Sequence, residues 1–245
     1  MLRIIVILSL FIGITVVEAA DIRVASAANF YPTLSKIKHK FEKYTGHRVT
    51  IIRGSTGKLY AQIVNGAPYD IFLSADSVRA DKLVTLGIAD NDEAIVYAIG
   101  QLCVWNPKAN SPQQIKEQLL SNNIKKLAVA NPRTAPYGQA AIETLKSMGL
   151  YEKLKSKLVF GENISQTLQF VQSGAADLGF VARSHMKDKF DESQYWNIAE
   201  DKHQPIKQKM LVLKKSKHIT AARSFMVFMQ TAEIKKLIRN DGYQL

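Results

Sequence analysis

Apolar residues recur along most of this chain at two alternating spacings. Short apolar runs of β-strand length alternate with stretches in which apolar residues return every three or four positions, as on one face of a helix. The first helical stretch places its apolar residues at Leu34, Ile37, Phe41 and Tyr44. Gly46 follows as its stop signal. Strands that alternate with helices in this way predict parallel, doubly wound sheets with helices on both faces.

The predicted elements form two sets separated by a long apolar run. The first set has strands at 21–27, 48–53 and 70–74 and helices at 32–44 and 59–64. The second set has strands at 126–130, 157–161 and 177–182 and helices at 139–148 and 165–172. After a polar stretch at 184–205, the chain closes with a strand at 208–213 and one long amphipathic helix from Thr220, as its N-cap, to Arg239.

The run from Glu93 to Trp105 is too long and too apolar for one ordinary strand, and a polar stretch follows it as far as Ser121. We interpret this run as a chain crossing between two lobes. The pattern therefore predicts a two-lobe α/β protein, with lobe I at residues 20–100 and 207–245 and lobe II at residues 101–206.

The first nineteen residues have the pattern of a secretory signal peptide. Arg3 precedes an apolar run from Ile4 to Val17, and Val17 and Ala19 stand at the −3 and −1 positions of a small-residue cleavage site. The alternative is a retained N-terminal anchor, which the lack of a basic cluster after Val17 disfavours. We expect an exported protein without stable membrane insertion.

Charge and cysteine content narrow the classes of function. The chain has 33 Lys and Arg against 21 Asp and Glu, a net charge of +12. These cations are spread along helix faces instead of forming one stripe with aromatic residues, so nucleic acid is not the expected partner. A positive field still favours encounter with a small anion. The single cysteine, Cys103, cannot form an internal disulfide and lies in an apolar run, where a buried thiol is expected.

Four loops join the carboxyl end of a predicted strand to the start of a helix, which is the edge where open α/β sheets bind ligands. They are residues 27–29, 54–57, 135–138 and 162–165. Their side chains are mostly small, hydroxyl or amide, and helix N-termini present free N–H groups that favour an anion. Routine capping explains any one of them, but two loops from each lobe predict a shared anion site.

Catalytic signals are weak. The five histidines have no metal-ligand spacing and stand in polar contexts, so we expect exposed positions for His39, His47, His185, His203 and His218. Asp70 and Asp76 flank a predicted strand. We expect them to cap helices or form turns and not to act as a general acid or base. The sequence carries no nucleophile elbow and no complete phosphate loop. The sequence therefore favours a binding protein over an enzyme.

Several motifs resemble the periplasmic molybdate-binding proteins of ABC importers. They are V-A-S-A-A-N-F at 24–30, the run from Gly54 to Asp76, Y-A-I-G at 97–100, N-P-R-T-A-P-Y-G at 131–138, G-E-N-I-S-Q at 161–166 and A-D-L-G-F-V-A at 176–182. The resemblance implies a type II periplasmic binding-protein fold with the ligand in the interlobe cleft. It also implies a monomer that has no cofactor, binds molybdate or tungstate, and delivers it to a membrane ABC permease.

The resemblance also implies a set of ligand-binding residues: Ala28, Asn29, Thr56, Tyr137 and Ile164. Asn29 and Thr56 would offer side-chain and backbone donors, and Tyr137 and Ile164 mainly backbone N–H groups. No residue would coordinate the metal directly, because molybdenum is bound as its oxyanion. Ala182 stands where one branch of the family has a tyrosine donor, so the chain resembles the asparagine-containing branch. Ala28 lacks the hydroxyl that this branch can have.

Two other functions stay open at this point. One is a receptor for sulfate, thiosulfate or phosphate, and the other is an exported enzyme that transforms an anion. A fully deprotonated dianion only accepts hydrogen bonds, so a site built from donors disfavours phosphate, whose hydroxyl needs an acceptor. Sulfate passes the same test, so the size of the site must separate it from molybdate.

Overall fold

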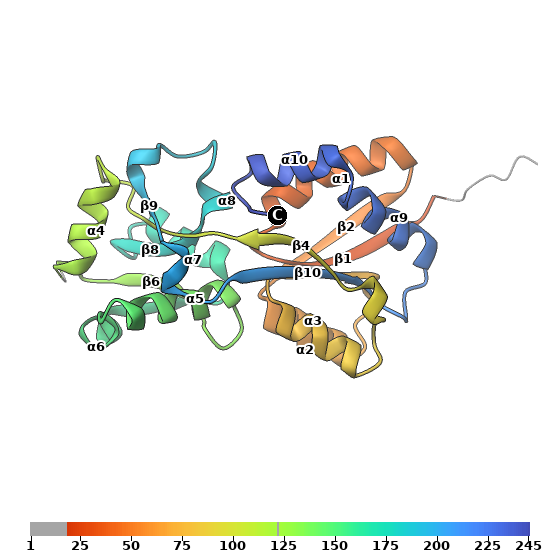
Figure 1. The fold of residues 1–245 in the computed structure, drawn as a ribbon, viewed down its shortest axis with the longest axis horizontal. Helices are drawn as coiled ribbons and strands as arrows, with labels where there is room; N and C mark the ends of the chain where they lie inside the picture. The colour runs from red at the N-terminus through yellow and green to blue at the C-terminus, as the bar shows by residue number, and fades with distance from the viewer. Residues whose placement is uncertain (1–18, 122) are drawn as a thin grey trace, which may run out of the picture.

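Two five-stranded sheets lie side by side in the computed structural model, each covered by helices (Figure 1). The structure describes residues 19–121 and 123–245. The predicted signal peptide therefore lies outside the described residues, apart from Ala19. We name the sheet that holds the first strand, with its helices, the first lobe, and the other sheet with its helices the second lobe.

The sheet of the first lobe is mixed, with the strand order β2-β1-β3-β10-β4. Its strands are β1 (Asp21–Ala27), β2 (Arg48–Gly54), β3 (Ile71–Ser74), β4 (Ile95–Gly100) and β10 (Ile206–Val212). β1 pairs in parallel with β2 and β3, whereas β10 runs antiparallel to both β3 and β4. Four strands therefore point one way, and only the returning β10 opposes them.

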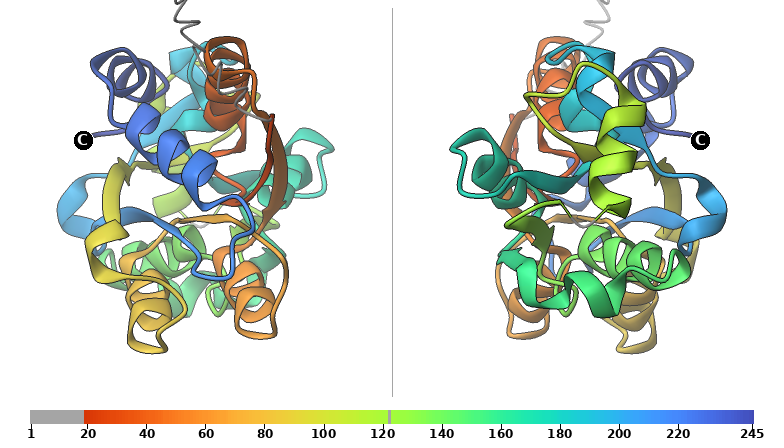
Figure 2. Two further views of the ribbon diagram at one scale, coloured as in Figure 1. Left: turned by 90° about the vertical axis from the view of Figure 1, so that its right-hand side faces the viewer. Right: turned by 90° about the vertical axis from the view of Figure 1, so that its left-hand side faces the viewer.

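Helices cover both faces of this sheet, as the alternation of apolar residues predicted. One face carries α1 (Tyr31–Thr45), α9 (Ile219–Met229) and α10 (Ala232–Asn240), and the other carries α2 (Thr56–Val64) and α3 (Ser77–Thr85). Along β1, Ile22 and Val24 pack in the core with α1, and Ala25 packs with α2. Figure 2 shows these helices above and below the strands.

The second lobe repeats this plan with the strand order β7-β6-β8-β5-β9. Its strands are β5 (Leu102–Trp105), β6 (Leu127–Ala130), β7 (Leu158–Gly161), β8 (Leu178–Ala182) and β9 (Tyr195–Asn197). Its α-helices are α4 (Pro112–Leu120), α5 (Pro136–Ser147), α6 (Tyr151–Leu154), α7 (Ile164–Gln172) and α8 (Arg183–Met186). Short 3-10 turns are η1 (Asn91–Glu93) in the first lobe and η2 (Lys155–Lys157), η3 (Glu192–Gln194) and η4 (Glu200–Lys202) in the second.

The chain crosses between the sheets where the long apolar run predicted. β4 belongs to the first sheet and β5 to the second, with only Gln101 between them. The chain returns through residues 198–205 into β10. Cys103 on β5 is buried, as expected. Because both crossings are short, the lobes are held close together.

Three predictions about elements were wrong. The C-terminal helix is two helices, because the backbone at Thr231 is extended and the chain turns there, so that Ile234 and Ile238 of α10 reach the core beside α1. Thr220 lies inside α9 instead of capping it. The polar stretch before Ser121 contains α4, which buries only Ile115 and Leu119, too few apolar positions to stand out in the sequence.

Candidate functional site

The four predicted loops meet in one cleft between the lobes. The strands β1 and β2 of the first lobe and β6 and β7 of the second are parallel neighbours, so each lobe presents two loops at one sheet edge. The cleft is partly open to solvent and has a cavity volume of only about 10 Å³. That is below the roughly 300–1,000 Å³ of sites for drug-sized organic ligands, so the cleft suits a small ion.

All five predicted residues line this cleft. The lining consists of Ala27, Ala28, Asn29, Gly54, Ser55, Thr56, Ala75, Ala135, Pro136, Tyr137, Asn163 and Ile164. None of these residues carries a charged side chain. An anion in the cleft would therefore be held by neutral hydrogen-bond donors.

Backbone N–H groups supply most of the donors. Within the described part of the chain, the N–H groups of Asn29, Thr56, Tyr137 and Ile164 donate to no protein acceptor. Thr56 and Ile164 are the first residues of α2 and α7, and Tyr137 is the second residue of α5. At these positions N–H groups have no partner inside the helix, and the helix dipole favours negative charge. These four N–H groups are therefore free to donate to an anion in the cleft.

The side chains of the first two loops differ in what they offer. The hydroxyl of Thr56 accepts a hydrogen bond from the N–H of Ala75 at 3.1 Å, which leaves its proton free to donate. Ala28 has only a methyl group, and its N–H already donates to Gly54 O at 2.9 Å. Ala28 therefore forms part of the wall and supplies no donor.

The side chain of Asn29 does not do what the sequence led us to expect. Its amide nitrogen donates to Gln208 Oε1 at 2.9 Å and to the hydroxyl of Tyr243 at 3.2 Å, so both amide hydrogens are engaged within the first lobe. Only its backbone N–H is left for a ligand. Gln208 is fully buried and also donates to the hydroxyl of Tyr137 at 3.3 Å, which links the two lobes.

Sequence reasoning missed Ser55. Its side chain is buried and lines the cleft, and its hydroxyl has no hydrogen-bond partner in the described residues. The signal available in the sequence was its place directly before Thr56, at the start of a helix. Any N-cap serine has that position, so the sequence alone did not distinguish it from a capping residue.

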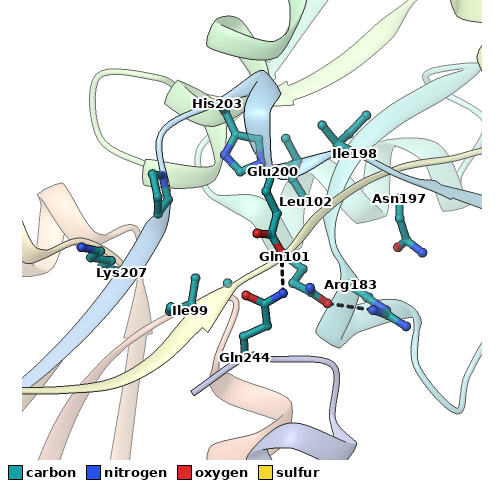
Figure 3. A pocket seen from close by; sticks show the side chains of 12 residues that line it. Ile99, Gln101, Leu102, Arg183, Asn197, Ile198, Glu200, His203, Lys207 and Gln244 are labelled. Atoms are coloured by element: carbon teal, nitrogen blue, oxygen red, sulfur yellow. Dashed lines mark hydrogen bonds between the residues drawn. The ribbon is translucent and has the colours of Figure 1, made fainter.

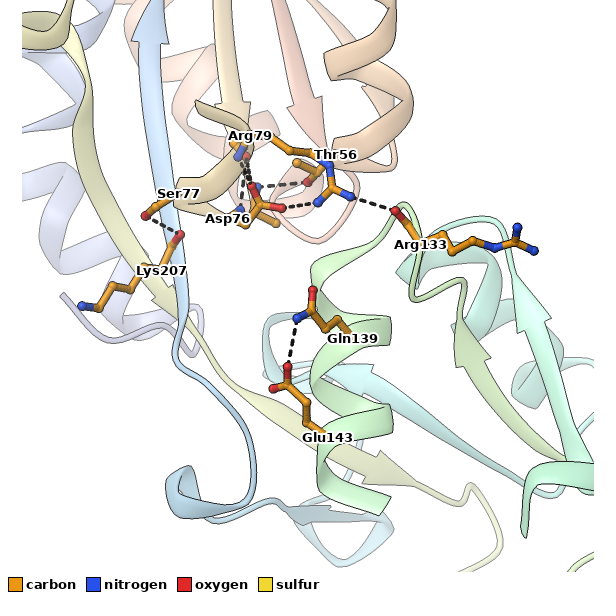
Figure 4. Close-up of polar contacts among 10 residues, drawn as sticks. Thr56, Asp76, Ser77, Arg79, Arg133, Gln139, Glu143 and Lys207 are labelled. Carbon is orange, nitrogen blue, oxygen red and sulfur yellow. Dashed lines mark hydrogen bonds and ion pairs between the residues drawn. The ribbon is translucent and has the colours of Figure 1, made fainter. Parts of the chain in front are cut away.

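Contacts across the mouth of the cleft join the lobes. The N–H of Gly57 donates to Thr134 O at 2.8 Å, and a guanidinium nitrogen of Arg79 donates to Arg133 O at 2.8 Å (Figure 4). Lys58 forms an ion pair with Glu162 at 2.8 Å. The two lobes are therefore in contact around the cleft, in a closed arrangement.

Two buried titratable groups near the cleft, Tyr137 and His185, are neutral at pH 7. Burial raises the pKa of Tyr137 well above its ordinary value of 10.0. Burial also lowers the pKa of His185 to about 4, against the opposite effect of the nearby carbonyls of Ala28 and Asn29. The expected exposure of His185 was wrong: only 2% of its surface is exposed, because α8 packs it beneath the first loop.

The acidic residues around β3 have structural roles. Asp76 caps α3 by accepting from the N–H of Arg79 at 2.8 Å, as predicted. Asp70 accepts from the N–H of Arg23 at 2.7 Å and from the hydroxyl of Ser216. The described residues contain no group of three or more His, Cys, Asp or Glu side chains placed to hold a metal ion.

A larger cavity lies where the chain crosses between the lobes (Figure 3). It has a volume of about 220 Å³ and is lined partly by Ile99, Leu102 and Ile198. Arg183 donates to Gln101 at 2.8 Å, and Gln244 donates to Glu200. These contacts tie the second lobe to the crossing segment and to the C-terminal residues, so this cavity belongs to the hinge region.

The chain is similar in sequence to known bacterial binding proteins. The family model of bacterial extracellular solute-binding proteins matches residues 22–244. The molybdate-binding protein ModA of Azotobacter vinelandii is 41% identical over 230 residues, which cover 93% of this chain and 91% of that protein. ModA of Rhodobacter capsulatus is 38% identical over 239 residues, covering 96% and 93%.

Solved structures agree with these sequence matches. The periplasmic molybdate-binding protein of Azotobacter vinelandii superimposes with a TM-score of 0.86 at 36% identity, covering 91% of this chain and 99% of that one. The sulfate-binding protein SubI of Mycobacterium tuberculosis has a TM-score of 0.73 at 14% identity, covering 91% of this chain and 86% of that one, a likeness of fold alone. The fold is the predicted type II periplasmic binding-protein fold, and the chain belongs to the family of bacterial extracellular solute-binding proteins.

Proposed function

We propose that this protein captures molybdate, and tungstate as its close chemical analogue, and delivers it to a membrane ABC permease. The observation that carries the proposal is the convergence of four unpartnered backbone N–H groups in a small, uncharged cleft. Relatives with up to 41% identity over nearly the whole chain are molybdate-binding proteins, which supports the same ligand.

The residue roles follow from the donors that remain free. Asn29, Tyr137 and Ile164 donate through backbone N–H groups, and Thr56 donates through both its N–H and its hydroxyl. Ala28 shapes the wall. A tetrahedral dianion offers acceptors on every side, so donors from four loops can bind it at once. Each bond to a charged acceptor is roughly twice as strong as a neutral one, and the cleft needs no counter-charge.

Binding is coupled to closure of the lobes. We place lobe I at residues 20–100 and 207–245 and lobe II at residues 101–206, so that each lobe contributes two of the donor loops. An anion between them pulls the lobes together, and the closed form is what the permease recognises. We propose that the protein acts as a monomer without catalysis.

The proposal places the mature protein in the periplasm after removal of residues 1–19. No helix of the described residues is long and apolar enough to cross a membrane. Among the relatives, the solved molybdate-binding protein of Azotobacter vinelandii carries the description periplasmic in its name.

Thermal unfolding with a series of oxyanions tests the proposal. A ligand at ~100 times its dissociation constant stabilises the folded state by roughly 2.7 kcal/mol, so molybdate and tungstate should raise the melting temperature clearly. Equimolar sulfate and phosphate should not. Native mass spectrometry of protein saturated with molybdate should show one bound oxyanion. An equal shift with sulfate would show that the receptor is not selective for molybdate, and no shift with any oxyanion would refute the anion site.

A further inference from the structure

The hydroxyl of Ser55 has no function in holding the protein together. Ser55 is 2% exposed, and its Oγ has no hydrogen-bond partner among the described residues. Buried hydroxyls in native structures are nearly always hydrogen-bonded, because an unpaired one keeps its full desolvation cost. Ser55 lines the anion cleft. An unpartnered polar group at that place indicates that the ligand itself supplies the hydrogen-bond partner.

Helix capping does not use this hydroxyl either. Ser55 is the N-cap residue of α2, a position at which a serine side chain usually accepts a hydrogen bond from the N–H two or three residues ahead. No such bond is formed. The N–H of Gly57 instead donates across the cleft to Thr134 O at 2.8 Å. The neighbouring hydroxyl of Thr56 is oriented by Ala75, so the two adjacent hydroxyls have different environments.

We propose that Ser55 is a further ligand-binding residue, whose hydroxyl donates a hydrogen bond to an oxygen of the bound oxyanion. The inference rests on the proposed function, because it requires a small anion in this cleft. It adds a second side-chain donor beside Thr56, from a residue that the family resemblance did not assign. The ligand then satisfies a buried hydroxyl for which the described residues offer no partner.

Isothermal titration of the purified protein with sodium molybdate, beside thermal unfolding without ligand, tests this role. Ser55→Ala should weaken molybdate binding by about tenfold, the usual effect of removing a donor to a charged acceptor. The same change should leave the melting temperature of the ligand-free protein equal or higher, since it removes a buried polar atom without a partner. Opposite effects on affinity and stability distinguish a ligand contact from a structural contact.

Ser26→Ala is the matched control. Ser26 is also fully buried, but its hydroxyl donates to Ala27 O at 3.2 Å and Ser26 does not line the cleft. This variant should lose thermal stability and keep its affinity within about twofold, the reverse of Ser55→Ala.

Three results would overturn the inference. Unchanged affinity in Ser55→Ala would show that the hydroxyl does not contact the ligand. A parallel loss of affinity and ligand-free stability would show a structural role. Failure of the unsubstituted protein to bind molybdate, tungstate, sulfate or phosphate would refute the anion site itself and the role of Ser55 with it.

Discussion

At the scale of single residues, some residues that line the cleft offer only a backbone N–H group, whereas others also offer a side-chain donor. Ile164 offers an N–H at the start of α7, and its side chain supplies no donor. Thr56 offers both an N–H and a hydroxyl, and the N–H of Ala75 orients that hydroxyl. Substitution should therefore have very different effects at two positions that line the same cleft.

We predict that Thr56→Ala weakens molybdate binding by about 1–3 kcal/mol, because a donor to a charged acceptor is lost. It should also lower the free energy of unfolding without ligand by about 1 kcal/mol, because the N–H of Ala75 loses its acceptor. Ile164→Val retains the backbone donor and should leave affinity nearly unchanged. Titration calorimetry and urea unfolding measure both quantities. A larger loss of affinity in Ile164→Val than in Thr56→Ala would contradict these roles.

At the scale of elements, the helix N-termini do more than present donors to the cleft. α2 also touches the second lobe at its second residue, Gly57. A Cβ atom at Gly57 would lie 2.9 Å from the Cα of Thr134 and 3.1 Å from its carbonyl oxygen. Both are backbone atoms, so they can give way only if the lobes separate. Closure therefore depends on glycine at this turn of α2.

Gly57→Ala should weaken molybdate binding by at least about tenfold, or 1.4 kcal/mol, because the added methyl group opposes the closed arrangement. The first lobe itself should not suffer. Alanine favours a helix over glycine by up to about 1 kcal/mol, so the ligand-free protein should be equally or more stable. Small-angle X-ray scattering should show less compaction on addition of ligand than in the unsubstituted protein.

The neighbouring variant Lys58→Gln serves as the control for this prediction. It removes an exposed ion pair with Glu162 without adding an atom at the lobe contact. Exposed ion pairs contribute about 0–1 kcal/mol, so its affinity should change less than in Gly57→Ala. Equal affinity of Gly57→Ala and the unsubstituted protein would show that the lobes bind the anion without this contact.

At the scale of the whole molecule, buried polar side chains join the two lobes behind the cleft. Gln208 on β10 accepts from Asn29 and from Tyr97, each at 2.9 Å, and donates to Tyr137 of the second lobe. A Cβ atom at Gly100, where the chain leaves the first sheet, would lie 2.2 Å from the hydroxyl oxygen of Tyr137. The network and the crossing therefore fix the relative position of the two loops that carry Asn29 and Tyr137.

His185 makes the stability of the whole molecule dependent on pH. Its pKa is about 4 in the folded protein against an ordinary value of 6.5, because burial disfavours the charged ring. Between these two pH values the unfolded chain binds more protons than the folded protein, so stability falls as the pH falls. The difference corresponds to roughly 3 kcal/mol, lost progressively from pH 6.5 down to pH 4.

Urea unfolding at about pH 7 and pH 4.5 measures this loss. His185→Gln should reduce the slope of stability against pH, whereas His39→Gln, at an exposed position of α1, should leave it unchanged.

Molybdate affinity should stay flat from about pH 6 to pH 9, because the lining residues carry no charge and Tyr137 ionises only far above that range. A tenfold change in affinity within that interval would reveal an ionisable group in the site.

Local sequence patterns were sufficient to predict a large part of this architecture. Apolar periodicity predicted the two α/β sets, and the long run from Glu93 to Trp105 predicted the crossing between the sheets. The loops at the ends of β1, β2, β6 and β7 were also predictable, because turn residues and helix starts follow from a few neighbouring residues. We also expected these loops to share one cleft, because neighbouring parallel strands end at the same edge of a sheet.

Only the tertiary structure decided what individual polar groups do. Asn29 and Gln208 are 179 positions apart, and their contact turns the Asn29 amide away from the donor role expected of it. His185 is buried because α8 packs against the first loop, and the hydroxyl of Ser55 is buried without a partner among the described residues. Packing between distant segments sets these environments. Periodicity and capping report only a residue's near neighbours in sequence, so they could not reveal them.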